Sequence, residues 1–363
     1  MKCVLSFSLL LGSLFGLAQI SCGQSVEQLI EDANAALAAR RVKDAIRSAS
    51  SAIKLDPKNI GPYRVRARAY LKLVEKEDRP LSQPPLGKEY PKSKDAKYAS
   101  DDIAAALKLD SKDAAAFALR GCLNSFLNNL EASDDDFERA GNVVKTDSWF
   151  KAVYQVTRIR LASGYAIEGS RVRNSVRGHK DDAYRKKVLF EARQLHDRAV
   201  ELDPTAEYFL RRAYTLEDIG EYESAIEDLG QYIRLNPNDF TGYYRRGLDY
   251  SNLGLFSQAV EDLQAALTAF DRFKDIDPAK QTELRTNIAK NLGLAGRFYE
   301  ALRMFDLALN ASRPSYLTYY ERGKIYLLIG ETEKAEADFR KAFADGGRYE
   351  PAEDELRKMG KIP

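Results

Sequence analysis

The sequence predicts an all-α protein in which short helix pairs stack one after another into a solenoid. One observation behind this prediction is a recurring phrase in which Leu or Ile is followed by Asp or Asn and, in four of five places, by Pro. The other is that small residues recur at fixed offsets within a period of about 34 residues. The phrase occurs at Leu55-Asp56-Pro57, Leu109-Asp110-Ser111, Leu202-Asp203-Pro204, Leu235-Asn236-Pro237 and Ile276-Asp277-Pro278.

Each phrase is expected to close an amphipathic helix. Proline lacks a backbone N–H and its ring collides with the preceding turn, so an α-helix rarely continues through it. The spacing of the phrases adds information, because Pro204 and Pro237 are 33 residues apart. That distance is typical of a repeat made of two helices joined by a turn.

Small and aromatic residues hold matching positions in successive units. In the fifth unit they are Ala213, Gly220, Tyr222, Ala225 and Pro237, and in the sixth they are Gly247, Tyr250, Gly254, Phe256, Ala259 and Ala266. The last two units have Ala289, Gly296, Phe298, Ala301, Phe305 and Ala308, and then Gly323, Tyr326, Gly330, Ala335, Phe339 and Ala342. Gly or Ala lets two crossing helices approach closely, while the aromatic side chains fill the space between units.

About eight units fit into one array that spans residues 26–349. They are predicted at 26–59, 60–113, 114–147, 148–205, 206–239, 240–273, 282–315 and 316–349. A short polar-faced helix from Pro351 to Met359 is expected within the final segment, 350–363, and should cap the last unit.

These residues resemble the tetratricopeptide-repeat family, and the resemblance covers almost all of the chain after residue 25. It implies a right-handed superhelical solenoid of helix-turn-helix repeats that binds a protein or extended peptide. The binding surface of the family is the concave groove lined by the first helix of each repeat.

Two units are longer than the family pattern, in each case between the first and the second helix. The insertion near 75–95 contains Pro80, Pro84, Pro85 and Pro91, and it reads either as a tolerated extended loop or as a polyproline ligand. The insertion near 163–187 is basic. It reads either as helix extensions with solvated faces or as a contact for an acidic partner or anionic lipid. Its basic residues are Arg171, Arg173, Arg177, Lys180, Arg185, Lys186 and Lys187.

The N-terminus reads as a secretory signal peptide within residues 1–23. Lys2 precedes an apolar run from Val4 to Ala18, which at about 15 residues is shorter than a bilayer-spanning helix. Cleavage after Ala18 and after Gly23 both remain open. Alternatively, Ile20-Ser21-Cys22 resembles a bacterial lipobox, although Gln19 departs from that pattern, and Cys22 would then be acylated. The expected location is therefore periplasmic or secreted, or anchored to a membrane as a lipoprotein.

Composition and motifs argue against an enzyme and against nucleic-acid binding. The 56 basic and 54 acidic residues give a net charge of +2, so no global field favours nucleic acid. The two histidines lack metal-ligand spacing, and no nucleophile elbow, phosphate-binding loop or dinucleotide fingerprint is present. We expect no catalytic residue, no cofactor, no metal and no small-molecule substrate. Cys122 is expected to be a small buried residue, and Asp134, Asp135 and Asp136 to open a helix.

Carrying the groove positions of the family onto this sequence gives a basic and aromatic set of candidate partner-binding residues. They are Arg64, Arg68, Lys151, Tyr154, Arg211, Tyr214, Tyr244, Arg245, Asn287, Lys290, Tyr320 and Lys324. Arg and Tyr can hold an extended acidic or aromatic peptide through charge-assisted hydrogen bonds and stacking. Acidic residues share the same positions, so a plain solvated surface is the competing interpretation. They are Glu207, Glu217, Asp218, Glu283 and Glu321.

One specialised groove is excluded. Chaperone-binding members of the resembling family hold a C-terminal carboxylate with a lysine and asparagine clamp, and the matching positions here carry other residues. They are Ile30, Asn34, Val65, Ala115 and Leu119 in the first units, and Leu210 and Tyr214 in the fifth. The leading hypothesis is an extracytoplasmic protein-interaction scaffold. The alternative is a membrane-anchored envelope assembly or secretion factor acylated at Cys22.

Overall fold

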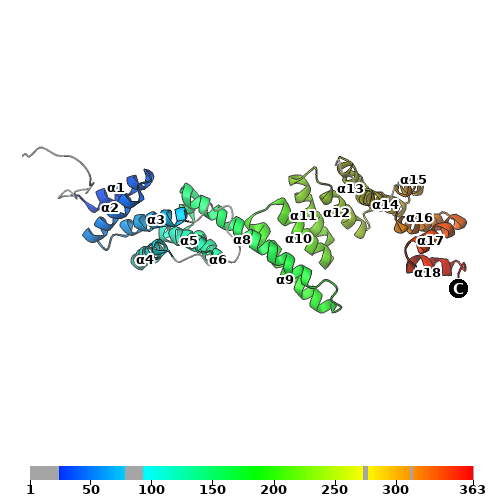
Figure 1. Ribbon diagram of the computed structural model, residues 1–363, viewed down its shortest axis with the longest axis horizontal. Coiled ribbons are helices and arrows are strands. Elements are labelled where there is room, and N and C mark those ends of the chain that lie inside the picture. Colours follow the sequence, from blue (N-terminus) through cyan, green and yellow to red (C-terminus); the bar gives the residue numbers. More distant parts are fainter. Residues whose placement is uncertain (1–23, 78–92, 273–276, 311–313, 363) are drawn as a thin grey trace, which may run out of the picture. The chain divides into compact units, whose positions relative to one another are not determined.

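The computed structural model describes residues 24–77, 93–272, 277–310 and 314–362, and these residues form eighteen α-helices and no β-strand. The predicted all-α solenoid class is confirmed: antiparallel helix pairs follow one another along the chain (Figure 1). The chain divides into two compact units, one ending at Arg158 and the other beginning at Ile159. Each unit is described by itself. The predicted signal peptide, residues 1–23, lies outside the described residues.

The first unit contains seven helices and the start of an eighth. They are α1 (Val26–Ala38), α2 (Val42–Leu55), α3 (Ile60–Glu77), α4 (Lys94–Leu109), α5 (Ala114–Phe126), α6 (Leu130–Ala140), α7 (Asn142–Thr146) and α8 (Ser148–Ser175). Helix α8 continues past Arg158 into the second unit. The short α7 was not distinguished by the sequence pattern.

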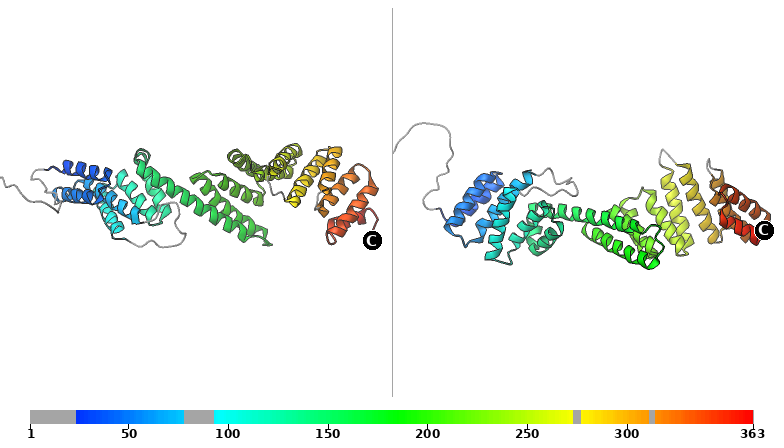
Figure 2. Two further views of the ribbon diagram at one scale, coloured as in Figure 1. Left: turned by 45° about the horizontal axis from the view of Figure 1, so that its top comes forward. Right: turned by 60° about the horizontal axis from the view of Figure 1, so that its bottom comes forward.

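The second unit contains the rest of α8 and ten further helices, which follow one another as adjacent pairs (Figure 2). They are α9 (Asp182–Leu202), α10 (Ala206–Ile219), α11 (Tyr222–Leu235), α12 (Phe240–Asn252), α13 (Phe256–Phe270), α14 (Pro278–Leu294), α15 (Phe298–Leu309), α16 (Tyr316–Leu328), α17 (Thr332–Asp345) and α18 (Glu350–Lys358). In α18, Ala352 and Leu356 are buried against α17.

Four of the five recurring phrases end a helix as predicted. Helices α2, α4, α9 and α11 stop at the Leu of their phrase. The fifth prediction was wrong, because α13 already ends at Phe270 and Pro278 is the first residue of α14. The carboxylate of Asp277 accepts the N–H of Ala279 at 3.0 Å and so caps α14. Proline fits the first turn because the N–H it lacks would have no helical partner there.

The acidic run was also placed wrongly by the sequence. Helix α6 begins at Leu130, so Asp134, Asp135 and Asp136 lie inside the helix and not at its start. Asp136 is buried and accepts two hydrogen bonds from Arg120, at 2.6 and 2.9 Å. The acidic side chain therefore serves a partner on the neighbouring helix and not the helix dipole.

A small residue and a large apolar residue meet where the two helices of a pair cross. A Cβ added to Gly247 would lie 2.8 Å from Leu263, and one added to Gly323 would lie 2.8 Å from Phe339. Both large side chains are fully buried. A larger residue at either glycine would therefore push the helices apart.

An arginine precedes the small residue and an aspartate precedes the large one, and the two form a buried ion pair. The pairs are Arg66–Asp102, Arg120–Asp136, Arg212–Asp228, Arg246–Asp262 and Arg322–Asp338. In each pair both carboxylate oxygens accept hydrogen bonds from one guanidinium, and the aspartates are 3–7% exposed. Bidentate geometry fixes how the two helices lie against each other.

The seventh helix pair, α14 and α15, has apolar side chains where the others have this ion pair. Ile288 precedes the small Ala289, and Met304 precedes the large Phe305. Ile288 is fully buried and Met304 packs against the same cluster. The crossing therefore accommodates either a complete ion pair or two apolar side chains, whereas a single buried charge without its partner would destabilise it.

Basic residues of the second insertion lie on extensions of α8 and α9. The extensions share a core made of Val172, Val176, Val188, Leu189 and Ala192. In the insertion near 75–95, residues 78–92 lie outside the described residues.

The substitution Arg246→Ile is expected to lower the free energy of unfolding by about 3 kcal/mol, because it leaves Asp262 buried without its partner. The double substitution Arg246→Ile with Asp262→Met copies the seventh crossing and should recover most of that loss. Urea unfolding followed by circular dichroism measures both. A double variant as unstable as the single one would show that the ion pair does not define the crossing.

Candidate partner-binding surface

The two predicted arginines of α3 are held by aspartates that cap later helices of the first unit. Arg64 donates to Asp113 at 2.5 Å, and Asp113 also accepts the N–H of Ala115 and so caps α5. Arg68 donates to both carboxylate oxygens of Asp147, at 2.7 and 3.1 Å. Both cations therefore fasten neighbouring helices.

An aromatic cluster surrounds Arg68. Its guanidinium lies 5.1 Å from the ring centre of Trp149, and the ammonium of Lys72 lies 4.3 Å from the same ring. The indole N–H of Trp149 donates to Glu75 at 3.2 Å, and Lys72 pairs with Glu75 at 2.9 Å. Packing of this kind stabilises the first unit and leaves little of Arg68 for a ligand.

Two further candidates of the first unit lie on α8. Tyr154 is half-buried, with its ring centre 5.0 Å from that of Phe137 and 5.6 Å from the guanidinium of Arg158. Burial raises the pKa of Tyr154, so the phenol stays protonated at neutral pH. Lys151 is exposed.

In the second unit, Tyr214 lies between two arginines from different helices. The guanidinium of Arg245 on α12 lies 4.6 Å from its ring centre, and that of Arg173 on α8 lies 5.4 Å from it. Arg245 also pairs with Glu217 at 3.0 Å. These contacts join the groove positions of α8, α10 and α12 into one surface.

The predicted residues of α12 and α14 also meet. The phenol of Tyr244 donates to Glu283, and the ammonium of Lys280 lies 4.0 Å from its ring centre. Burial and the bond to Glu283 raise the pKa of Tyr244, while the side chain of Asn287 hydrogen-bonds to the same phenol. Lys290 lies one turn further along α14 and is half-buried.

The last candidates lie on α16. The ring of Tyr320 packs edge-on against Tyr349 with centres 5.3 Å apart, and the ammonium of Lys324 lies 5.0 Å from its centre. Lys324 pairs with Glu321 at 2.6 Å. This end of the surface is therefore also satisfied within the chain.

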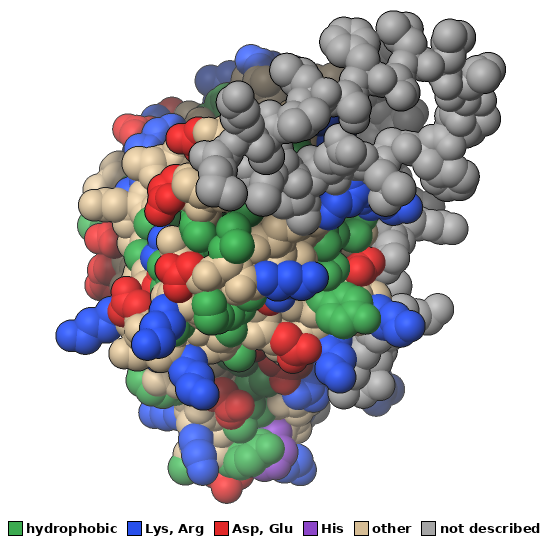
Figure 3. All heavy atoms as spheres, turned by 90° about the vertical axis from the view of Figure 1, so that its left-hand side faces the viewer, with side chains coloured by type: hydrophobic (Ala, Val, Ile, Leu, Met, Phe, Trp, Pro, Cys, Tyr) green, Lys and Arg blue, Asp and Glu red, His purple; other side chains and the backbone are tan. Residues whose placement is uncertain are grey.

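The five acidic residues that share the groove positions all have partners in the second unit. They are Glu207 with Arg211, Glu217 with Arg245, Asp218 with Arg173, Glu283 with Tyr244 and Lys280, and Glu321 with Lys324. The groove surface is thus charged but close to neutral. On the face drawn in Figure 3, basic and acidic side chains are likewise interspersed.

A pocket of about 350 Å³ opens beside this surface, between α8 and α10. Its lining includes the predicted Arg211 and Tyr214, together with Ser170, Arg173, Asn174 and Arg177. Arg173 and Arg177 belong to the basic insertion, for which contact with an acidic partner was one of the two interpretations, whereas Ser170 and Asn174 were not singled out. A signal for Ser170, Arg173 and Asn174 was present, because their spacing of three or four places them on one face of α8. The register of that face against α10 is not readable from the sequence.

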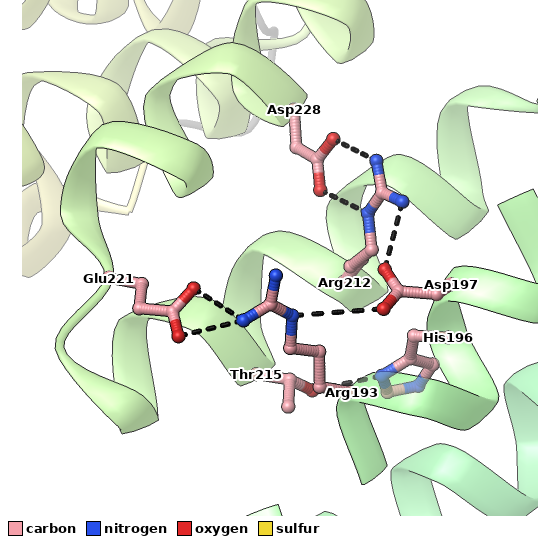
Figure 4. Close-up of polar contacts among 7 residues, drawn as sticks. All are labelled: Arg193, His196, Asp197, Arg212, Thr215, Glu221 and Asp228. Atoms are coloured by element: carbon pink, nitrogen blue, oxygen red, sulfur yellow. Dashed lines mark hydrogen bonds and ion pairs between the residues drawn. The ribbon is translucent and has the colours of Figure 1, made fainter. Parts of the chain in front are cut away.

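An ion-pair network joins α9, α10 and α11 next to the pocket helices (Figure 4). Arg212 bridges Asp228 at 2.7 Å and Asp197 at 3.0 Å. Arg193 donates to Glu221 at 2.7 Å and lies 3.7 Å from Asp197. Three helices are therefore fixed by two guanidinium groups, which leaves the pocket wall rigid.

His196 is a buried structural residue at the centre of the same region (Figure 4). Its Nε2–H donates to the carbonyl of Ala166 at 3.3 Å, and its Nδ1 accepts from the hydroxyl of Thr215 at 2.9 Å. Burial lowers the pKa of His196 from 6.5 to about 4, so the ring is neutral at pH 7. It links α8, α9 and α10 and faces no open site.

Two buried carboxylates lie under the surface at α10 and α12. Glu217 and Asp249 each have an oxygen without a hydrogen-bond partner among the described residues. Burial, and to a smaller extent the charge of Glu217, raise the pKa of Asp249 from 3.8 to about 8, while the charge of Arg245 opposes this rise. Asp249 therefore holds a proton across most of the range in which other carboxylates are ionised.

The described part of the chain holds no group of three or more His, Cys, Asp or Glu side chains that could bind a metal ion. Cys122 is fully buried with its pKa raised by burial, in agreement with a packing role. Among the described helices, none combines the length and the apolarity that crossing a membrane requires.

Comparison with known proteins shows repeats of one kind. A family model described as tetratricopeptide repeat matches residues 206–239 and 316–344. The chain is 29% identical over 144 residues to anaphase-promoting complex subunit 3 of Schizosaccharomyces pombe, covering 38% of this chain and 20% of that protein. It is 26% identical over 162 residues to human tetratricopeptide repeat protein 13, covering 43% of this chain and 18% of that protein. The matches thus span about a fifth of each relative.

Solved structures give similar matches at low identity. A tetratricopeptide repeat protein of Parabacteroides merdae matches with a TM-score of 0.36 and 15% identity, covering 92% of this chain and 98% of that one. A thermophilic protein of Thermus thermophilus matches with a TM-score of 0.41 and 17% identity, covering 54% of this chain and all of that one.

Between pH 4 and pH 8, Asp249 is expected to make the protein less stable as the pH rises. The folded chain keeps a proton there that the unfolded chain releases, so the free energy of unfolding falls by up to about 1.4 kcal/mol per pH unit. Below pH 4 Asp249 is protonated in both the folded and the unfolded chain, so it no longer changes the free energy of unfolding as the pH falls.

The substitution Asp249→Asn should remove this part of the pH dependence. Urea unfolding of wild type and variant at pH 5 and pH 8 measures the difference, in which the opposite contribution of His196 cancels. Equal pH dependence in the two proteins would contradict a protonated Asp249.

Proposed function

Because this chain carries tetratricopeptide repeats, we propose that it is a non-enzymatic scaffold outside the cytoplasm that binds a protein or extended peptide along its first helices. Such repeats generally form extended surfaces for protein–protein interaction. The observation that carries the proposal is the continuous surface from Arg173 through Tyr214 to Arg245, which joins three first helices in the second unit.

The stacked side chains suit a binding surface because they are already ordered. Tyr214 is contacted by two guanidinium groups, and the side chain of Arg245 is 38% exposed while it pairs with a Glu217 that is 12% exposed. A partner that contacts this surface therefore orders few side chains on binding. Tyr and Arg are also the residue types that contribute most at protein interfaces.

The near-neutral charge of the surface sets how a partner would be recognised. Because the acidic groups at the groove positions already pair with Arg, Lys or Tyr, an arriving charge has to exchange with an existing pair. Exposed pairs such as Glu207 with Arg211 contribute about 0.2–1 kcal/mol, so their exchange costs little. Specificity then comes from the order of pairs along the groove and not from a single-sign field.

Export is proposed from the N-terminal pattern alone, in which Lys2 precedes an apolar run and small residues follow. Mass analysis of the protein from its native host tests it. A chain that begins after Ala18 or Gly23 supports a soluble exported scaffold, whereas a chain that begins at an acylated Cys22 supports the anchored assembly factor. A chain that retains its first residues would contradict both.

The double substitution Tyr214→Ala with Arg245→Ala is expected to reduce capture of the partner at least about tenfold, because it removes the centre of the surface. Crosslinking in the native extract followed by mass spectrometry measures the captured proteins. The matched control is Tyr299→Ala with Arg303→Ala, two exposed residues on a second helix.

Melting curves first establish that both double variants are folded. If the groove variant is unfolded, Arg245→Gln replaces it, since the amide can still hydrogen-bond to Glu217. An unchanged set of captured proteins in the folded groove variant, or an equal loss in the control, would contradict binding at this surface.

A further inference from the structure

The pocket between α8 and α10 concentrates three guanidinium groups around about 350 Å³ of space. Arg173 comes from α8, Arg177 from the turn after α8 and Arg211 from α10, with Ser170 and Asn174 beside them. Glu207 supplies the single carboxylate among the lining residues. The volume lies at the lower end of the range found for binding sites, which suits one side chain of a partner.

Two of the three arginines are held in place by the protein. Arg173 donates to Asp218 at 2.5 Å and its side chain is only 16% exposed. Arg211 donates to the hydroxyl of Ser170 at 2.9 Å, which directs it towards α8. Both guanidinium groups keep further N–H donors, since each group has five. The cationic wall of the pocket is thus preorganised.

The third arginine has no anionic partner. Arg177 is exposed in the turn that follows α8, and within the described ranges no hydrogen bond or ion pair joins its side chain to another side chain. It lines the same pocket as Arg173 and Arg211. Because Arg173 pairs with Asp218 and Arg211 with Glu207, the uncompensated Arg177 leaves the pocket with an excess of positive charge.

We propose that this pocket binds the carboxylate of an acidic side chain in a peptide segment of the partner; the inference rests on the proposed function of the surface next to it. The carboxylate lies between Arg211 and Arg177, whose planar forks match its two oxygens. Ser170 and Asn174 lie beside the same space and can donate further hydrogen bonds.

Displacement of Glu207 makes room for this carboxylate. Glu207 pairs with Arg211 from one turn earlier on α10, and its side chain is 63% exposed. An exposed pair at this spacing contributes little to stability, so its loss on binding costs little. Released into solvent, Glu207 needs no new partner.

The rest of the pocket favours a peptide over a phosphate or a lipid surface. Leu210 and Tyr214 complete the lining, and both offer apolar contact to a neighbouring side chain. Tyr214 also leads directly to Arg245, so a segment with its acidic side chain in the pocket can continue along α12. The fitting ligand is an acidic residue next to an apolar one.

The test uses two fluorescein-labelled peptides, one with three Glu-Gly-Leu-Ser repeats and one in which each Glu is replaced by Gln. Fluorescence anisotropy at 50 mM salt gives their affinities for the mature full-length protein. We expect the Glu peptide to bind at least about tenfold more tightly than the Gln peptide. Arg177→Ala and Arg211→Ala should each weaken the Glu peptide about tenfold, with Arg177→Lys intermediate because lysine lacks the fork.

Arg171→Ala is the matched control, because Arg171 is an exposed arginine of α8 that pairs with Glu168 and does not line the pocket. It changes the net charge equally and should alter the affinity less than about twofold. An equal loss in all three alanine variants would show non-specific charge attraction and overturn the inference. Equal affinity for the two peptides would overturn it as well.

Competition separates the sources of the anion. If millimolar inorganic phosphate displaces the Glu peptide, or if phosphatidylglycerol vesicles bind with the same Arg177 dependence, the ligand of the pocket is a phosphate or a lipid headgroup and the proposal of a peptide carboxylate is overturned. The two proposals can fail separately. If capture of the partner depends on Tyr214 and Arg245 but the peptide shows no dependence on Glu, the scaffold function stands and the carboxylate pocket does not.

Discussion

Each helix pair depends on a small residue at the point where its two helices cross. At Gly247 or Gly323 even a single added carbon would lie 2.8 Å from the large side chain of the second helix. This close approach puts the preceding arginine within reach of the aspartate that precedes the large residue, 16 residues later in four of the five pairs. The crossing thus combines an apolar contact with an ion pair, and both depend on a residue no larger than alanine at one position.

The Arg–Asp pairs at the crossings are formed within each helix pair. The opposite side of the first helices is therefore available for contacts with neighbouring repeats. On this side of the first helices the charged residues also have partners, but each partner belongs to another repeat, as in Arg245 with Glu217 or Arg68 with Asp147. The pairs fix neighbouring first helices against each other and keep the surface near neutral. The turn after the extended α8 departs from this rule, because it adds Arg177 to the surface without adding its counter-charge. This uncompensated charge is the feature that distinguishes the proposed binding pocket from a solvated face.

Local signals in the sequence were sufficient for most of the helices. Proline after Leu-Asp or Leu-Asn ended three helices as predicted, because its effect depends only on the adjacent turn, and Leu109-Asp110-Ser111 ended a fourth without proline. The same logic failed at Asp277 and Pro278, where aspartate caps and proline begins a helix. Both outcomes are allowed for an Asp-Pro pair, and only the preceding residues distinguish them. The spacing of Arg and Asp at the crossings was present in the sequence but was not recognised as an ion pair.

The groove positions of the first helices were predictable, whereas their contacts were not. The partner of Arg68 lies 79 residues away at Asp147, and the pocket residues of α8 meet α10 only because an extended helix continues past its own repeat. Such contacts depend on stacking, which single positions do not encode. The most direct test of the account is hydrogen–deuterium exchange of the protein with and without its purified crosslinked partner. The account predicts slower exchange in residues 170–177, which form the end of α8 and the turn after it, in α10 and in α12. Protection confined to the second helices α11 and α13 would contradict it.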